Sequence, residues 1–176
     1  MTKPEEFEFI EKALKNNEIL LKNKIFKPKL LYRATKDGDS SKEFHNKCDN
    51  IKGTLTLVKT KKAFIFGGYT NEIWNNNGGF FRKDNDAFCF SIDLKKIYKF
   101  KKSENSSIKC DKDYGPYFGV TFFGINNNCL INGGMMNEGL NKYYEGQEKE
   151  NEINNGEINF GVEEVEVFEI KYEKSI

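Results

Sequence analysis

The stretch TLTLVKT at residues 54–60 decides the fold class, because apolar and polar side chains alternate along it. Alternation with a period of two is typical of a β-strand that buries one face. The stretch AFIFGGY at residues 63–69 follows after a Lys-Lys turn and has the composition of a second strand. Together the two stretches predict an antiparallel hairpin.

Further strands are expected around this hairpin. They are predicted at residues 30–33, 87–92, 97–100, 117–123, 129–131 and 162–172. Small residues alternate with Phe88 and Phe90, which indicates that both faces of that strand are covered. In the last strand two apolar residues, Val167 and Phe168, adjoin, and a β-bulge would explain the change of phase. These short strands with Gly- and Asn-rich turns predict a mainly β protein with a minority of helix, an antiparallel β-sandwich flanked by a few helices.

The N-terminal part is predicted to precede the sandwich. Residues 4–22 are expected to form a helix, because apolar residues recur near one face. Residues 23–29 are interpreted as a connector that ends near Pro28. The chain is therefore divided into a helical N-terminal segment with its connector, residues 1–29, and a β-rich domain, residues 30–172.

Composition limits the classes of function. The chain has 176 residues, of which 28 are basic and 27 acidic, so its formal net charge is +1. Such a chain has no long-range field for nucleic acid or an anionic membrane, and no apolar stretch long enough for membrane insertion. The four cysteines form no CxxC pair and no signal peptide is evident, so we expect reduced thiols and a cytoplasmic or nuclear protein.

Several sequence blocks occur in order along the chain. They are LLYRATKDG at 30–38, FH at 44–45, CD at 48–49, GTLTLVK at 53–59, FGGYT at 66–70 with Trp74, DAFCFS at 86–91, GP at 115–116 with FG at 118–119, and VEEVEVF at 162–168. This ordered set resembles the TLDc domain of the oxidation-resistance proteins. Departures from the family pattern are Asp39 in place of an aromatic residue, Gly53 in place of a proline, and diverged loops at 103–112 and 145–159.

The resemblance implies a β-sandwich flanked by helices and no catalytic centre, so we expect neither an enzyme nor a bound cofactor. It further implies roles in oxidative-stress resistance and in regulation of the vacuolar proton-pumping ATPase. In that role the module binds the peripheral, nucleotide-hydrolysing sector of the pump. Such a partner would bring the chain to the surface of endolysosomal membranes without inserting it.

Two other functions remain open. Ser40 and Glu43 have the spacing of a capping box and predict the start of a short helix. His45 and Cys48 lie three residues apart on this helix, so a thiol-dependent redox enzyme or antioxidant protein is one alternative. Tyr69 and Trp74 beside an Asn-Gly loop could stack on a sugar ring, so a carbohydrate-binding module is the second. One histidine and scattered cysteines do not supply zinc spacing, so no metal site is expected.

Aromatic and arginine side chains are the usual anchors of a protein interface. Those expected to be exposed and to contact a partner are Tyr69, Trp74, Arg82, Tyr143 and Tyr144. Those expected to form the centre of one core are Leu55, Leu57, Phe66, Phe88 and Phe90.

Overall fold

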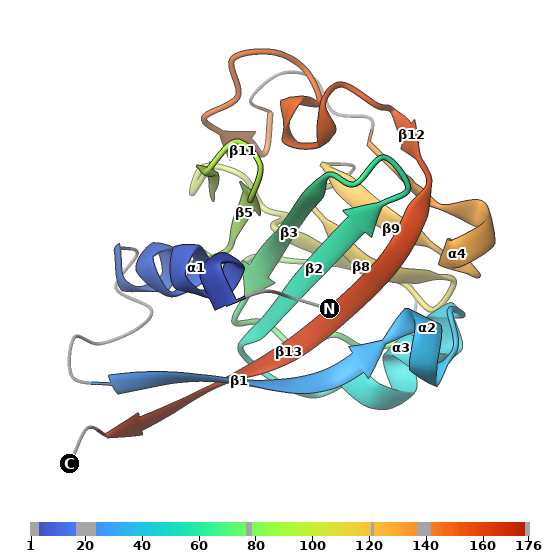
Figure 1. The fold of residues 1–176 in the computed structure, drawn as a ribbon, viewed down its shortest axis with the longest axis horizontal. Helices are drawn as coiled ribbons and strands as arrows, with labels where there is room; N and C mark the ends of the chain where they lie inside the picture. Colours follow the sequence, from blue (N-terminus) through green and yellow to red (C-terminus); the bar gives the residue numbers. More distant parts are fainter. Residues whose placement is uncertain (1–3, 17–23, 77–78, 121, 137–141, 175–176) are drawn as a thin grey trace.

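The computed structural model describes residues 4–16, 24–76, 79–120, 122–136 and 142–174. Two antiparallel sheets pack face to face, with short helices at one end and one longer helix on an outer face (Figure 1). The predicted β-sandwich with a minority of helix is therefore confirmed. None of the helices in these ranges is long and apolar enough to cross a membrane.

The first sheet has the strand order β1-β13-β2-β3-β5-β6-β11. Its strands are β1 (Lys24–Arg33), β2 (Thr54–Thr60), β3 (Ile65–Thr70), β5 (Phe88–Ser91), β6 (Lys96–Phe100), β11 (Tyr144–Glu145) and β13 (Val162–Lys174). The predicted hairpin is confirmed as β2 and β3. The long strands β1 and β13 pair with each other, so segments far apart in the sequence lie side by side (Figure 1).

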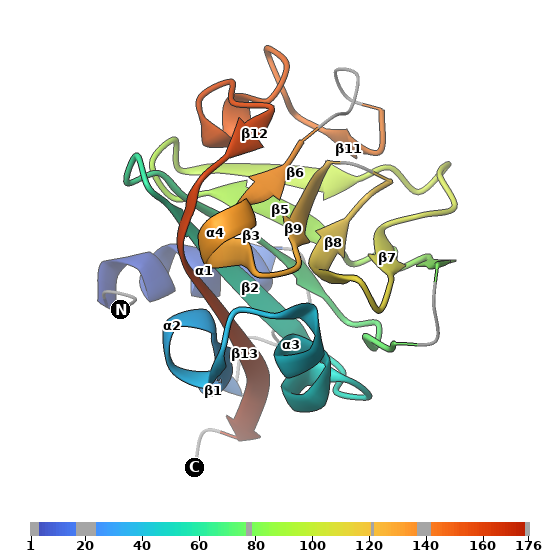
Figure 2. The same cartoon turned by 90° about the vertical axis from the view of Figure 1, so that its right-hand side faces the viewer.

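The second sheet has the order β12-β10-β9-β8-β7-β4 and faces the viewer in Figure 2. Its strands are β4 (Phe80–Arg82), β7 (Ile108–Cys110), β8 (Tyr114–Phe118), β9 (Phe123–Asn126), β10 (Gly134–Met135) and β12 (Asn159–Phe160). Within the described ranges β4 has one strand neighbour, β7, and so forms one edge of this sheet.

Helical segments lie at the periphery of the sheets. They are α1 (Pro4–Asn16), α2 (Ala34–Asp37), α3 (Ser41–Cys48), α4 (Cys129–Asn132) and the 3-10 turn η1 (Glu152–Asn154). The predicted start of α3 is confirmed, because the Ser40 side chain accepts a hydrogen bond from the Glu43 backbone N–H at 3.3 Å. Residues 17–22 of the predicted N-terminal helix lie outside the described residues.

The apolar interior is divided into two clusters. The larger lies between the sheets and contains Phe66, Trp74 and Phe118 among others. The smaller lies on the outer face of the first sheet under α1, with Ile10 and Leu14 of the helix among its members. Four of the five residues predicted at the centre of one core, Leu55, Leu57, Phe88 and Phe90, belong to this smaller cluster, whereas Phe66 belongs to the larger. The expectation of one common centre is therefore wrong, because alternate residues of a strand point to opposite faces.

Some predicted elements are also corrected. Residues 24–29 of the expected connector are part of β1, paired with β13. The predicted strand at 117–123 is two strands, β8 and β9, because the chain turns at Gly119, where φ is +66°. Residues 129–131 form the helical turn α4, bounded by Asn128 and Gly133 with positive φ. Short apolar runs do not distinguish a strand from a helical turn.

The β-bulge expected at Val167 and Phe168 lies on the partner strand instead. Pairing passes from Leu30 opposite Phe168 to Tyr32 opposite Val167, so the extra residue is on β1. Val167 points into the cluster between the sheets and Phe168 into the cluster under α1. Adjacent apolar residues therefore mark a strand covered on both faces.

Candidate functional site

Three of the five predicted contact residues are buried. Tyr69, Trp74 and Tyr144 have relative exposures of 1%, 0% and 0%. The Trp74 indole N–H donates to the Thr54 hydroxyl at 2.9 Å, and the Tyr144 hydroxyl donates to the Ser107 carbonyl at 2.7 Å. The expectation that these three are exposed is wrong, because aromatic residues next to the strands close the ends of the core. With Tyr69 and Trp74 buried, the proposed sugar-stacking surface is lost as well.

Arg82 and Tyr143 keep part of their side chains at the surface. Arg82 ends β4, and its carbonyl accepts a hydrogen bond from the Ser107 backbone N–H at 2.9 Å. The Ser107 carbonyl in turn accepts from Tyr144, the neighbour of Tyr143 in the chain. The Lys142 ammonium lies over the Tyr143 ring, 5.1 Å from its centroid. Ser107 therefore links the end of β4 to Tyr144, the chain neighbour of Tyr143.

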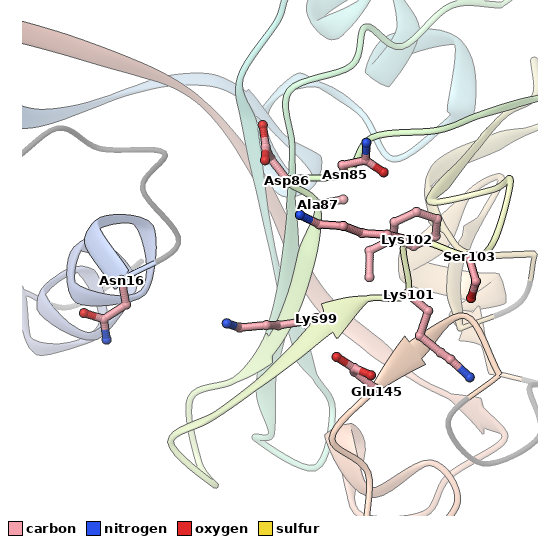
Figure 3. Close-up of a pocket in the computed structure, with 10 residues that line it drawn as sticks. Asn16, Asn85, Asp86, Ala87, Lys99, Lys101, Lys102, Ser103 and Glu145 are labelled. Carbon is pink, nitrogen blue, oxygen red and sulfur yellow. The ribbon is translucent and has the colours of Figure 1, made fainter.

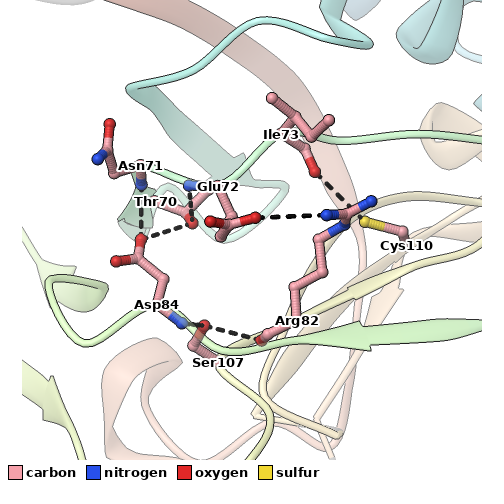
Figure 4. A network of polar contacts seen from close by, with 8 residues as sticks. All are labelled: Thr70, Asn71, Glu72, Ile73, Arg82, Asp84, Ser107 and Cys110. Carbon is pink, nitrogen blue, oxygen red and sulfur yellow. Dashed lines mark hydrogen bonds and ion pairs between the residues drawn. The ribbon is translucent and has the colours of Figure 1, made fainter.

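A polar network holds the Arg82 side chain (Figure 4). Its guanidinium Nη1 lies 3.4 Å from the Glu72 carboxylate, and both side chains are 31% exposed. On the buried side of the strand the Cys110 thiol donates to the Ile73 carbonyl, with Sγ 3.6 Å from the oxygen. Arg82 is thus positioned by Glu72 and remains accessible from solvent.

The turn after β4 is fixed by the buried carboxylate of Asp84 (Figure 4). This carboxylate accepts hydrogen bonds from the Thr70 hydroxyl at 2.8 Å and the Asn71 backbone N–H at 2.6 Å. The Asp84 backbone N–H donates to the Ser107 hydroxyl, which donates to the Arg82 carbonyl. A buried carboxylate with this many donors rigidifies its surroundings, so β4 is held in place by the first sheet.

The residues that sequence reasoning missed lie beside Arg82. Phe80 and Phe81 of β4 are 59% and 49% exposed, although they are large and apolar. Nothing in the FFR tripeptide distinguishes an edge strand from a central one. Only the strand order shows that β4 is at an edge, and that order depends on contacts distant in sequence.

The cysteines do not form a reactive thiol site. All four are buried, and none of them is in a disulfide. Burial, followed by the Asp49 carboxylate, raises the pKa of the Cys48 thiol far above its ordinary value, and burial raises the pKa of Cys129 to about 12. Burial also raises the pKa of Cys110, although the Arg82 guanidinium reduces the effect. A thiol with a raised pKa is a poor nucleophile at neutral pH because little thiolate is present.

His45 is engaged away from Cys48. Its Nδ1 lies 2.7 Å from the Asp49 carboxylate, and its Nε2 lies 3.0 and 3.1 Å from the carbonyl oxygens of Asp111 and Tyr114. The ring is buried and meets the Phe44 ring edge-on. These contacts tie α3 to the turn between β7 and β8, so the geometry fits a structural histidine rather than the base of a thiol nucleophile. Within the described part of the chain, no three His, Cys, Asp or Glu side chains are grouped to hold a metal ion.

A polar cavity of about 710 Å³ lies between the end of α1 and the ends of β5 and β6 (Figure 3). It is lined by Asn16, Asn85, Asp86, Ala87, Lys99, Phe100, Lys101, Lys102, Ser103 and Glu145. In Figure 3 the side chains of Lys99 and Lys102 extend to the same side, and that of Lys101 extends to the opposite side. The three ammonium groups do not converge, and the carboxylates of Asp86 and Glu145 also line the cavity. The cavity therefore does not form an anion-binding site.

Because the thiols are buried, we expect them to be unreactive in the native chain. Iodoacetamide added to the native chain is expected to modify none of the four cysteines, because each is buried. After denaturation without reductant, all four are expected to react. Intact mass spectrometry counts the adducts. Fewer than four after denaturation would show a disulfide, and rapid labelling of the native chain would contradict the buried positions.

The comparisons with known proteins agree with this fold. A protein-family model described as TLDc domain matches residues 1–171. The match includes α1 and β1 as well as the sandwich, so the N-terminal segment lies within the matched region. The comparison with curated proteins gave no match.

Proposed function

The chain belongs to the TLDc domain family, and from this premise we propose that it is a non-catalytic module that acts by binding a protein partner. The observation that carries the proposal is the family match over residues 1–171 of 176. Two features of the chain support it. The thiols are buried, and a rigidly held strand presents Phe80, Phe81 and Arg82 to solvent.

The partner we propose is the peripheral sector of the vacuolar proton-pumping ATPase, through which the chain would contribute to oxidative-stress resistance. The near-zero net charge favours recognition through local anchors rather than a long-range field. Arg82 and Tyr143 suit this role, because arginine and tyrosine are enriched among the residues that dominate binding energy. Tyr69, Trp74 and Tyr144 are left out of the proposed contact, since they are buried.

Substitution of the two surface anchors tests the contact region. The folded chain is expected to retain soluble pump subunits from a lysate of the source organism, and Arg82→Ala or Tyr143→Ala is expected to lower retention roughly tenfold each. Lys59→Ala is the control, because Lys59 is a partly exposed residue of β2 whose ion pair is with Glu163 of the neighbouring strand β13 in the same sheet.

The possible outcomes separate the partner from the contact residues. If the folded wild-type chain retains no pump subunit, the partner assignment is lost. If both anchor variants retain pump subunits as well as the wild type does, the partner assignment stands, and Arg82 and Tyr143 are excluded as contacts.

A cysteine-free chain separates partner binding from thiol chemistry. Alanine at Cys48, Cys89, Cys110 and Cys129 is expected to keep protection against peroxide in cells, provided that the variant folds. The reason is that buried thiols are shielded from peroxide. Thermal melting checks folding, and two double variants replace the quadruple one if it does not fold. Loss of protection in a well-folded variant would favour the redox alternative.

A further inference from the structure

β4 is an edge strand with exposed apolar side chains. β4 is the last strand of the second sheet and pairs with β7 in the described ranges. Its first two residues, Phe80 and Phe81, are 59% and 49% exposed. An edge strand has unpaired backbone groups, and apolar side chains on it favour pairing with another chain.

The other sheet edges differ from β4. The long edge strand β1 carries Lys27, Pro28 and Lys29, and lysine and proline are residues that protect an edge from pairing. The remaining edge strands, β11 and β12, are two residues each. Edge protection is therefore stronger on the long edge than on β4, which has one charged residue in the sequence Phe-Phe-Arg.

The residues of β4 are complementary to a second copy of the same strand. Phe80 and Arg82 share one face, opposite Cys110 and Ile108 of β7, and Phe81 lies on the other face. In an antiparallel pair centred on Phe81, the two Phe81 side chains meet on one face. On the other face each Phe80 meets the partner's Arg82, a pairing of a cation with an aromatic ring.

The same register avoids a clash of like charges. Lys83 follows Arg82 and would lie opposite the partner's Gly79, where nothing comes within 4 Å of the position of a Cβ. The cations of the two strands thus face an aromatic ring and an open glycine rather than each other. This self-complementarity favours a second copy over an unrelated extended segment.

We propose that this protein self-associates as a two-fold dimer in which β4 pairs antiparallel with β4 of a second copy, centred on Phe81. The pairing is short, so the interface falls below the roughly 1,600 Å² of a standard one and the dissociation constant is expected to be on the order of 100 µM. The dimer covers Arg82, so self-association would compete with a partner that uses this residue.

Sedimentation velocity of the full chain between about 10 µM and about 1 mM tests the proposal. The wild type is expected to shift from monomer to dimer across this range. Phe81→Lys places like charges at the centre of the pair and is expected to weaken dimerisation at least tenfold. Leu94→Lys is the matched control, because Leu94 is a 52% exposed apolar residue in the turn between β5 and β6.

Cross-linking tests the register. Residues directly opposite each other in an antiparallel pair have Cα atoms roughly 4.5–5.5 Å apart, within disulfide reach. Phe81→Cys is therefore expected to form a disulfide dimer on mild oxidation, with the native cysteines buried. In the Lys83→Cys variant the thiols of the two copies would lie roughly 13 Å apart along the strands, so no disulfide dimer is expected.

These experiments test self-association independently of any binding to the pump. If the wild-type chain stays monomeric at about 1 mM, the proposed dimer is ruled out, and the β4 edge would then be available for pairing with a different protein. Dimerisation that survives Phe81→Lys but not Leu94→Lys also overturns the proposed dimer. A disulfide at Lys83→Cys but not at Phe81→Cys overturns the register centred on Phe81.

Discussion

Phe90→Ala is expected to lower the free energy of unfolding by about 3–5 kcal/mol, a large part of the stability of a typical domain. Phe90 is fully buried on β5, in the cluster that α1 covers. Its ring lies 6.2 Å from that of Phe88 and next to the backbone of Gly67 on the neighbouring strand. Truncation removes these contacts and leaves a cavity that the rigid sheet cannot fill by collapse.

Urea denaturation at low protein concentration measures the effect. Phe81→Ala is the matched control, because the same substitution at a 49% exposed position of β4 is expected to cost less than about 1 kcal/mol in the monomer. Equal costs for the two variants would contradict the placement of β5 in the interior.

Gly67→Ala is expected to destabilise the chain by about 3 kcal/mol or more, although it adds one methyl group. A Cβ at Gly67 would lie 1.9 Å from the carbonyl oxygen of Thr56 and 2.9 Å from the Phe90 ring. The ring can move, whereas the carbonyl belongs to the backbone of β2 and cannot move without disturbing the pairing of β2 with β3. The glycine is thus required for the close approach of the two strands.

Thermal or urea unfolding tests this requirement, with Gly156→Ala as the control. Nothing lies within 4 Å of a Cβ at Gly156, but its φ of +90° strains an L-residue, so we expect a cost of about 1–2 kcal/mol there. A cost at Gly67 that is no larger than at Gly156 would show that the strands separate easily.

Local sequence patterns predicted much of the fold. The alternation of TLTLVKT and the Lys-Lys turn predicted β2 and β3, and Ser40 with Glu43 predicted the start of α3. These features depend on neighbours in the chain. The turn α4 was predicted as a strand, because an apolar run of three residues has no distinguishing period. The division of the core between two faces depends on α1 covering the first sheet. The small residues beside Phe88 and Phe90 indicated two covered faces, but no local pattern showed which element covers the outer one.

The candidate site was predicted less well, for a related reason. Arg82 and Tyr143 are partly exposed, whereas Tyr69, Trp74 and Tyr144 are buried. An aromatic residue at the end of a strand has the same sequence context whether it closes the core or faces solvent. Phe80 and Phe81 are exposed because β4 is an edge strand, and strand order is set by pairing between residues far apart in the chain.

The proposed binding to the pump's peripheral sector is tested most directly by isothermal calorimetry, in which the purified chain is titrated onto that purified sector. We predict saturable binding with a defined stoichiometry, weakened by Arg82→Ala and unchanged in the cysteine-free variant. Absence of binding at about 100 µM, with a chain that melts cooperatively, would contradict the claim.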